Sequence, residues 1–159
     1  MADEIMETTA HDDLENRLMT FFIKDVIHGI QLRHVIEIIS IQYITKVPNV
    51  PNYVKGIINL RGKIVPVVDT RLKIGIEETE YDDKTCIIVI MIGELQIGLI
   101  VDSVNEVLTI TNNAITRMPD VSEQKTKKYL QSVTKMNNQM ILHLDLDYLI
   151  NDDNIELEL

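Results

Sequence analysis

The sequence predicts an all-β protein built from two small barrels that share a hydrophobic core, and three observations support this prediction. Many short runs rich in Ile and Val are separated by Gly, Pro and Asn turns, a pattern typical of small barrels. The two halves of the chain repeat the same order of these runs. A barrel of about 55–60 residues buries little apolar surface by itself, so two of them gain stability by packing together.

Apolar runs in the first half predict a series of short strands. They occupy residues 17–24, 28–32, 35–39, 41–47, 56–60 and 63–68. Pro48 and Pro51 interrupt the ladder before the last two strands, and a turn of helix is expected around 51–54. Asp69 is expected to cap a short helical turn that runs through Leu72.

The second half follows an acidic linker at 75–83, which is the clearest internal boundary. Its predicted strands and capped helix occupy residues 85–92, 95–101, 104–110, 129–136, 139–144 and 145–150. Residues 112–119 are expected to form turns, and residues 120–128 a polar loop. We therefore divide a single body, residues 16–151, into subdomains at about 16–75 and 84–151, and leave an exchange of strands between them open.

The internal repeat is visible as matched residues at two fixed offsets. At an offset of 69 residues, Glu37 falls on Glu106, and at an offset of 76, Asp69 falls on Asp145. One hairpin differs between the copies, because Arg61-Gly62 in the first half corresponds to Asn137-Asn138 in the second. Gly62 admits the positive φ of a tight turn. Since the second copy dispenses with a basic tip, we interpret Arg61 and its flanking glycines, Gly56 and Gly62, as features that serve a partner.

Most of the net charge lies outside the predicted body. The 159 residues include 25 acidic and 15 basic side chains, a formal net charge of −10. Ten of the acids lie in residues 1–15 and 152–159, which contain neither Lys nor Arg and are predicted to be a flexible arm and tail. The remaining body is neutral, which argues against nucleic-acid binding. The longest apolar run, 86–92, is too short to span a bilayer, and with no secretory signal we expect a soluble, cytoplasmic protein.

The sequence contains no evident catalytic or metal-binding set. The four histidines, His11, His28, His34 and His143, lack ligand-type neighbours at the spacing of zinc sites. Cys86 lies in an apolar strand and is interpreted as a buried, inert thiol. Neither a nucleophile elbow nor a phosphate-binding loop occurs. We therefore expect a protein-binding module with neither cofactor nor metal, and the alternative is an unrecognised hydrolase that uses His143 or Cys86.

One long segment resembles a known family. Residues 50–71, VPNYVKGIINLRGKIVPVVDTR, closely resemble the signature of the CheW-like domain family of bacterial chemotaxis. Residues 29–38 and 98–108 are similar to the family's two other recognisable blocks, so the resemblance extends from about Leu18 to Ile150. His28 departs from the pattern, because many members carry an aromatic residue there, usually Tyr.

The resemblance implies two five-stranded, SH3-like barrels and a non-enzymatic adaptor. Such an adaptor joins the cytoplasmic tips of methyl-accepting chemoreceptors to the regulatory domain of the histidine kinase CheA, at receptor arrays on the inner face of the membrane but without inserting into it. Related domains are also fused to other domains, in CheA itself and in CheV. The length of this chain favours a stand-alone coupler, monomeric when free. A decoy member that binds receptors without coupling them to a kinase is a further alternative.

The resemblance also implies a receptor-binding groove with residues from both halves. Carried over by position, they are Val35, Glu37, Gly56, Arg61, Gly98, Val104 and Val107. The resemblance brings the strands of Glu37 and Arg61 together, so we predict an ion pair between these two side chains.

Overall fold

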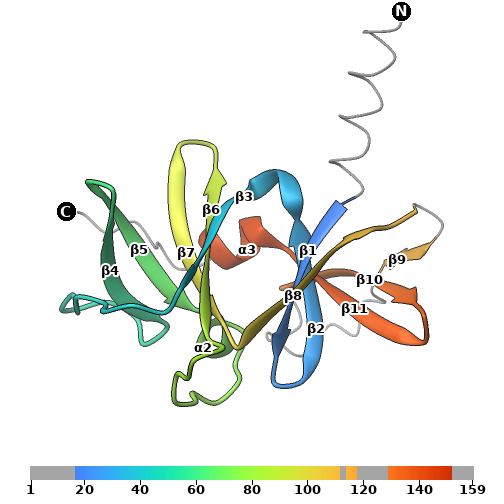
Figure 1. Cartoon of the computed structure of the whole chain (residues 1–159), viewed down its shortest axis with the longest axis horizontal. Coiled ribbons are helices and arrows are strands. Elements are labelled where there is room, and N and C mark those ends of the chain that lie inside the picture. The colour runs from blue at the N-terminus through green and yellow to red at the C-terminus, as the bar shows by residue number, and fades with distance from the viewer. Residues whose placement is uncertain (1–16, 112–113, 118–128, 152–159) are drawn as a thin grey trace, which may run out of the picture.

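The structure, a computed structural model, describes residues 17–111, 114–117 and 129–151, and these residues form two β-sheets (Figure 1). In spatial order, the five-stranded sheet contains β3 (Val35–Ser40), β6 (Cys86–Ile92), β7 (Leu95–Val101), β5 (Lys63–Asp69) and β4 (Val54–Leu60). The six-stranded sheet contains β8 (Ser103–Thr109), β1 (Arg17–Ile23), β2 (Val26–Gln31), β11 (Gln139–Leu144), β10 (Leu130–Met136) and β9 (Ile115–Arg117). The described helices are all short: η1 (Leu32–His34), α2 (Thr70–Lys73) and α3 (Leu146–Asn151). The predicted all-β class is confirmed.

Three local predictions differ from the structure. Residues 41–47 do not form a strand, and only Thr45 makes an isolated bridge, to Ile57. Since Pro48 lacks a backbone N–H, this segment cannot extend the ladder. Residues 51–54 form a turn rather than a helix, in which the Val54 N–H donates to the Pro51 carbonyl over 3.0 Å. The short strand β9 lies where turns were expected. The predicted arm 1–15, loop 120–128 and tail 152–159 lie outside the described residues.

The two sheets exchange hairpins. The β1–β2 hairpin of the first half pairs with strands of the second half, and the β6–β7 hairpin of the second half pairs with strands of the first. Each exchanged hairpin makes one parallel contact, with Gly29 opposite His143 and Gly98 opposite Val67. These two contacts are equivalent, because the offset of 69 takes Gly29 to Gly98 and the offset of 76 takes Val67 to His143. The repeat is therefore a pseudo-twofold symmetry, and the sheets do not follow the division at the linker.

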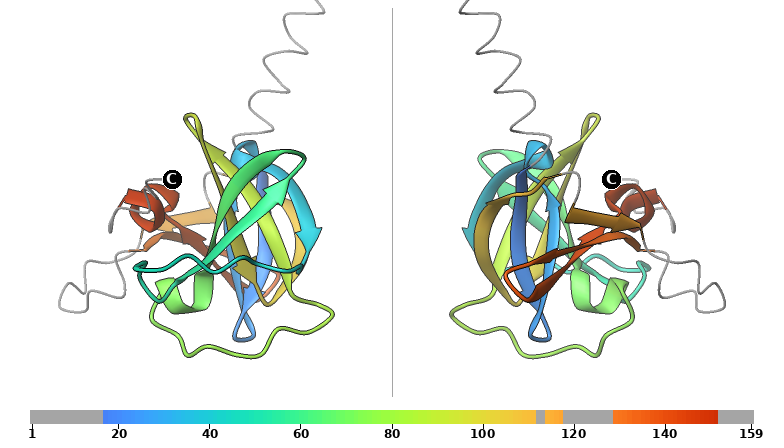
Figure 2. Two further views of the ribbon diagram at one scale, coloured as in Figure 1. Left: turned by 90° about the vertical axis from the view of Figure 1, so that its left-hand side faces the viewer. Right: turned by 90° about the vertical axis from the view of Figure 1, so that its right-hand side faces the viewer.

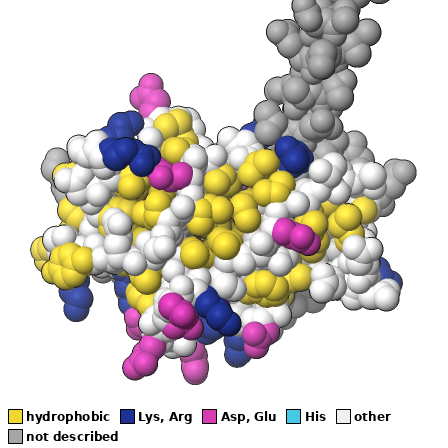
Figure 3. Space-filling model, in the orientation of Figure 1, with side chains coloured by type: hydrophobic (Ala, Val, Ile, Leu, Met, Phe, Trp, Pro, Cys, Tyr) yellow, Lys and Arg dark blue, Asp and Glu magenta, His cyan; other side chains and the backbone are white. Residues whose placement is uncertain are grey.

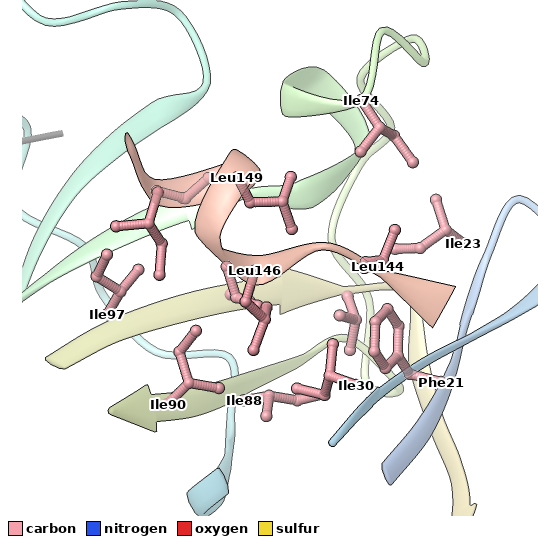
Figure 4. Close-up of a cluster of buried hydrophobic side chains, with 14 of the residues drawn as sticks. Phe21, Ile23, Ile30, Ile74, Ile88, Ile90, Ile97, Leu144, Leu146 and Leu149 are labelled. Carbon is pink, nitrogen blue, oxygen red and sulfur yellow. The ribbon is translucent and has the colours of Figure 1, made fainter. Parts of the chain in front are cut away.

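Side chains from both sheets form one shared core. Phe21 and Ile30 of the six-stranded sheet pack with Ile88 and Ile90 of the five-stranded sheet, and Leu149 of α3 packs with them (Figure 4). Separate clusters fill the interior of each barrel. The predicted shared core is therefore present, and α3 contributes to it.

The two ends of the five-stranded barrel are distinct. The side views show the tips of the β4–β5 and β6–β7 hairpins at one end and the acidic linker that follows α2 at the other (Figure 2). Tyr81 fixes the linker, because its hydroxyl donates to the buried Asp69 carboxylate over 2.7 Å and its ring packs against the barrel interior. Burial raises the pKa of Tyr81, so the phenol remains a hydrogen-bond donor.

Candidate protein-binding groove

The predicted ion pair between Glu37 and Arg61 is confirmed. The two guanidinium nitrogens of Arg61 donate to the two carboxylate oxygens of Glu37, with Nη1 at 3.3 Å from Oε2. The pair joins β3 to the β4–β5 turn, and β3 and β4 lie at opposite ends of the strand order of the five-stranded sheet. The Arg61 side chain is 72% exposed, so solvent screening leaves only a small contribution to stability. The main effect of the pair is to fix where the guanidinium lies.

Arg61 has a backbone conformation that long side chains rarely adopt. Its φ is +51° and that of Gly62 is +85°, which are the signs required by a type I′ hairpin turn. The equivalent Asn137 and Asn138 have φ values of +51° and +64°. Asn tolerates this region far better than Arg does. Lys24 in the β1–β2 turn has a φ of +49° as well, so the backbone conformation of Arg61 does not by itself assign it a role.

Gly56 is required by the fold. A Cβ at this position would lie 2.0 Å from the carbonyl oxygen of Thr45. Thr45 is held there by two backbone hydrogen bonds of 2.9 Å with Ile57. The interpretation that Gly56 leaves space for a partner is therefore wrong at this position, because the chain itself fills the space. Gly62 has open space around it and is explained by its positive φ.

Gly98 is also a packing requirement. It is buried in β7, where a Cβ would lie 2.7 Å from the Cγ2 atom of Ile87. Gly56 and Gly98 therefore shape the region from within, whereas Arg61 and Glu37 are accessible at its edge.

The apolar members of the predicted groove lie on two edge strands, β3 and β8, which cross the same face of the molecule (Figure 1). Val35 lies opposite Ile90 and Val104 lies opposite Phe21, so the two valines occupy equivalent positions, and both pack against the shared core. Val107 is 41% exposed. Hydrophobic side chains form a broad area across the middle of this face (Figure 3).

Ile36 and Ile38 are exposed apolar residues of β3 that are not among the predicted groove residues. They are 42% and 39% exposed on β3. The available signal was the run of five residues, Val35 to Ile39, in which apolar side chains do not alternate with polar ones. Such a strand presents apolar groups on both faces and must therefore expose some of them unless another layer covers it.

Three other basic side chains in residues 55–73 have partners within the chain. Lys55 pairs with Glu78, Arg71 pairs with Asp102, and the Lys73 ammonium lies 4.2 Å from the centroid of the Tyr53 ring. Arg61 and Lys63 are the exposed bases of this stretch, and of these two only Arg61 is held in place by a carboxylate.

The residues of the hydrolase alternative lie in different sheets. His143 is buried in β11, where its Nε2 atom shares a hydrogen bond of 2.6 Å with the Thr134 hydroxyl, and burial lowers the pKa of its imidazole. The Cys86 thiol in β6 donates to the Lys84 carbonyl, and burial raises its pKa. A thiol with a raised pKa is a poor nucleophile at neutral pH.

The described residues offer neither a metal site nor a membrane-spanning helix. Within them, no three or more Cys, His, Asp or Glu side chains cluster in a way that could hold a metal ion. Among the described helices, none has the length and apolar character needed to cross a membrane.

Comparisons with known proteins place the whole described body in one family. The family described as CheW-like domain matches residues 17–154. The chemotaxis protein CheW of Thermotoga maritima is 33% identical over 147 residues, which cover 92% of this chain and 95% of that protein. CheW of Klebsiella aerogenes is 29% identical over 148 residues, which cover 93% and 89%. The crystal structure of the scaffolding protein TtCheW from Thermoanaerobacter tengcongensis superposes with a TM-score of 0.77 at 33% identity and covers 85% of this chain and 87% of that one.

Proposed function

The chain belongs to the CheW-like domain family and is a chemotaxis scaffold protein, and we propose that it couples methyl-accepting chemoreceptors to the histidine kinase CheA. The observation that carries this proposal is Arg61, which a carboxylate fork from Glu37 holds beside an exposed apolar surface. A fixed guanidinium next to apolar side chains suits recognition of a protein surface, because it adds an oriented charge to apolar contact.

In this proposal the receptor tip occupies the groove of β3 and β8. Val35, Val104 and Val107 supply apolar contact, Arg61 donates to an acceptor on the receptor, and Glu37 orients Arg61. Gly56 and Gly98 act indirectly, since each allows another part of the chain to approach closely. The regulatory domain of CheA contacts the ends of the barrels. The protein acts without catalysis, in the cytoplasm at receptor arrays, and is monomeric when free.

Reconstitution with a receptor fragment and CheA tests the proposal. Arg61→Glu should fold normally but abolish receptor-dependent kinase autophosphorylation, because it repels Glu37 and removes the donor. Lys63→Glu is the matched control, because Lys63 is an exposed base two residues away whose side chain makes no hydrogen bond or ion pair within the described chain. Normal activation by Arg61→Glu, or equal loss with Lys63→Glu, contradicts the assigned role. If the wild-type protein binds the receptor fragment without activating the kinase, the chain is the decoy instead.

A further inference from the structure

A charged clamp holds the start of β8 against α2. Arg71 donates from Nε to Oδ1 of Asp102 over 2.7 Å and from Nη2 to Oδ2 over 2.5 Å. The backbone N–H of Lys24, in the β1–β2 turn, donates to the same carboxylate over 2.8 Å. Asp102 immediately precedes β8, so this clamp ties one strand of the proposed groove to the body of the protein.

The pseudo-twofold symmetry places a second charged pair at the equivalent junction. At the offset of 69, Asp102 corresponds to Arg33, and at the offset of 76, Arg71 corresponds to Asp147. Both halves therefore carry opposite charges at these two positions, but their order is reversed. The residue before the strand is acidic in one half and basic in the other, and the residue in the helix is the opposite. The signal for this second pair in the sequence is a pair of opposite charges at repeat-related positions.

Backbone contacts support both equivalences. Val35 and Val104 follow Arg33 and Asp102 by two residues, and their partners in the sheets, Ile90 and Phe21, are themselves 69 residues apart. The loop before each helix is fixed in the same way as well. The Asp69 N–H donates to the Tyr53 carbonyl, and the Asp145 N–H to the Tyr129 carbonyl, each over 2.7 Å.

The second pair is open in this structure. Arg33 and Asp147 line a pocket of about 170 Å³, together with Gln31, His34, Ile92, Leu144, Asp145 and Leu146. The Nε atom of Arg33 donates to Oε1 of Gln31 over 2.7 Å, outside any ion pair. The side chain of Asp147 takes part in no hydrogen bond or ion pair among the described residues. The junction that Arg71 closes in one half is thus an open pocket in the other, with both Arg33 and Asp147 exposed to solvent.

We propose that Arg33 and Asp147 form a latch, in which the Arg33 side chain leaves Gln31, crosses the pocket and pairs with Asp147. The closed latch ties the start of β3 to α3, as the Arg71–Asp102 clamp ties the start of β8 to α2. The inference rests on the proposed function, because β3 carries Val35 and Glu37 of the receptor groove. Closure fixes the strand that the receptor contacts, so receptor binding and latch closure favour each other.

The first experiment uses the free, full-length protein and requires no partner. Thermal unfolding is measured for Arg33→Asp, Asp147→Arg and the double exchange variant, which recreates the charge order of Asp102 and Arg71. Each single variant places like charges at the pocket. The double variant should therefore have a Tm about 2–4 °C above the value expected from the two single shifts. Simple additivity overturns the latch, because it shows that the two side chains do not meet.

The second experiment measures affinity for a receptor fragment by calorimetry. Arg33→Gln and Asp147→Asn should each weaken binding roughly 3- to 10-fold, and the double variant should be no weaker than either single variant. Lys135→Gln, an exposed base on β10, is the control and should bind like the wild type. Losses that multiply in the double variant overturn the coupling. If even the wild type does not bind, the proposed function fails, and the unfolding experiment still decides whether the latch exists.

Discussion

Val67 and His143 occupy the same position in the two barrels, and each lies opposite a glycine of the neighbouring parallel strand. Val67 belongs to the apolar interior of the five-stranded barrel together with Ile58. In the six-stranded sheet, Thr134 replaces Ile58 and shares a buried hydrogen bond with His143. One barrel therefore contains a polar pair where the other contains an apolar contact.

Replacing this polar pair as a unit should be much less harmful than breaking it. His143→Val leaves the buried Thr134 hydroxyl without its partner and should lower the free energy of unfolding by about 1–3 kcal/mol. Thr134→Ile combined with His143→Val copies the other barrel and should recover most of that loss. Urea unfolding measures both variants. If the double variant is less stable than the single one, the two barrel interiors are not equivalent.

Acid should destabilise the protein below about pH 6.5. Burial lowers the pKa of both His28 and His143, and contacts with the Val26 carbonyl and with Asp102 only partly offset this for His28. In the folded state both imidazoles stay neutral to a lower pH, whereas the unfolded chain binds protons as the pH falls through about 6.5. The stabilisation is thus complete above that pH and declines below it, by at most about 1.4 kcal/mol per pH unit for each histidine. The Thr134→Ile/His143→Val variant should show a shallower dependence of Tm on pH between 5 and 8.

Gly56→Ala should be more damaging than Gly62→Ala. Both glycines have positive φ, which costs an L-residue about 1–2 kcal/mol, but only position 56 also places a Cβ against backbone, at 2.0 Å from the Thr45 oxygen. Position 62 has open space around it. Circular dichroism melts of the two variants compare the effects directly. Equal shifts in Tm would show that the Thr45 segment moves aside freely.

Arg61→Asn separates the stability of the hairpin from its recognition role. Asn suits the left-handed backbone better, and the lost ion pair is exposed, so the free energy of unfolding should stay within about 0.5 kcal/mol of the wild type. Receptor-dependent kinase activation should nevertheless be lost. Urea unfolding and the kinase autophosphorylation assay are therefore run on the variant and the wild type together. Retained activation would mean that Arg61 is an ordinary turn residue.

Asp102→Asn should loosen the contact between the two sheets. Burial by itself would raise the pKa of Asp102, but hydrogen bonds from Arg71 and the Lys24 N–H, with the charge of Arg71, lower it overall. Because the carboxylate is favoured in the folded state, its contribution is present above about pH 3.9 and is lost as the pH falls through the lowered value. At neutral pH the variant should lose about 1–3 kcal/mol, since it leaves the half-buried Arg71 without its carboxylate. Chemical denaturation measures the free energy of unfolding of the variant and of the wild type. A difference below about 0.5 kcal/mol would mean that the clamp does not stabilise the fold.

Local signals predicted much of the fold. Asp69 accepts from the Leu72 N–H as expected of a helix cap, and the Glu37–Arg61 pair is present. The exchange of hairpins was not predictable from the repeat, because β1–β2 and β6–β7 have the same apolar pattern and either could complete either sheet. The Thr45 bridge was hidden for a different reason. It depends on a single close approach at Gly56, which leaves no periodic pattern in the sequence.

The exchanged hairpins also bear on how the chain is made. The ribosome releases β1 and β2 first, yet β1 needs β8 as its neighbour, and the Thr20 hydroxyl accepts from the Glu106 N–H, which is 86 residues away. The six-stranded sheet cannot form until residues up to Leu144 have emerged, so the hairpins of the newly made first half must wait without their partners from the second half. Such long-range pairing slows folding and lengthens exposure to aggregation during synthesis. Cutting the chain in the linker at 75–83 would for the same reason yield two fragments that complete their sheets only when they are together.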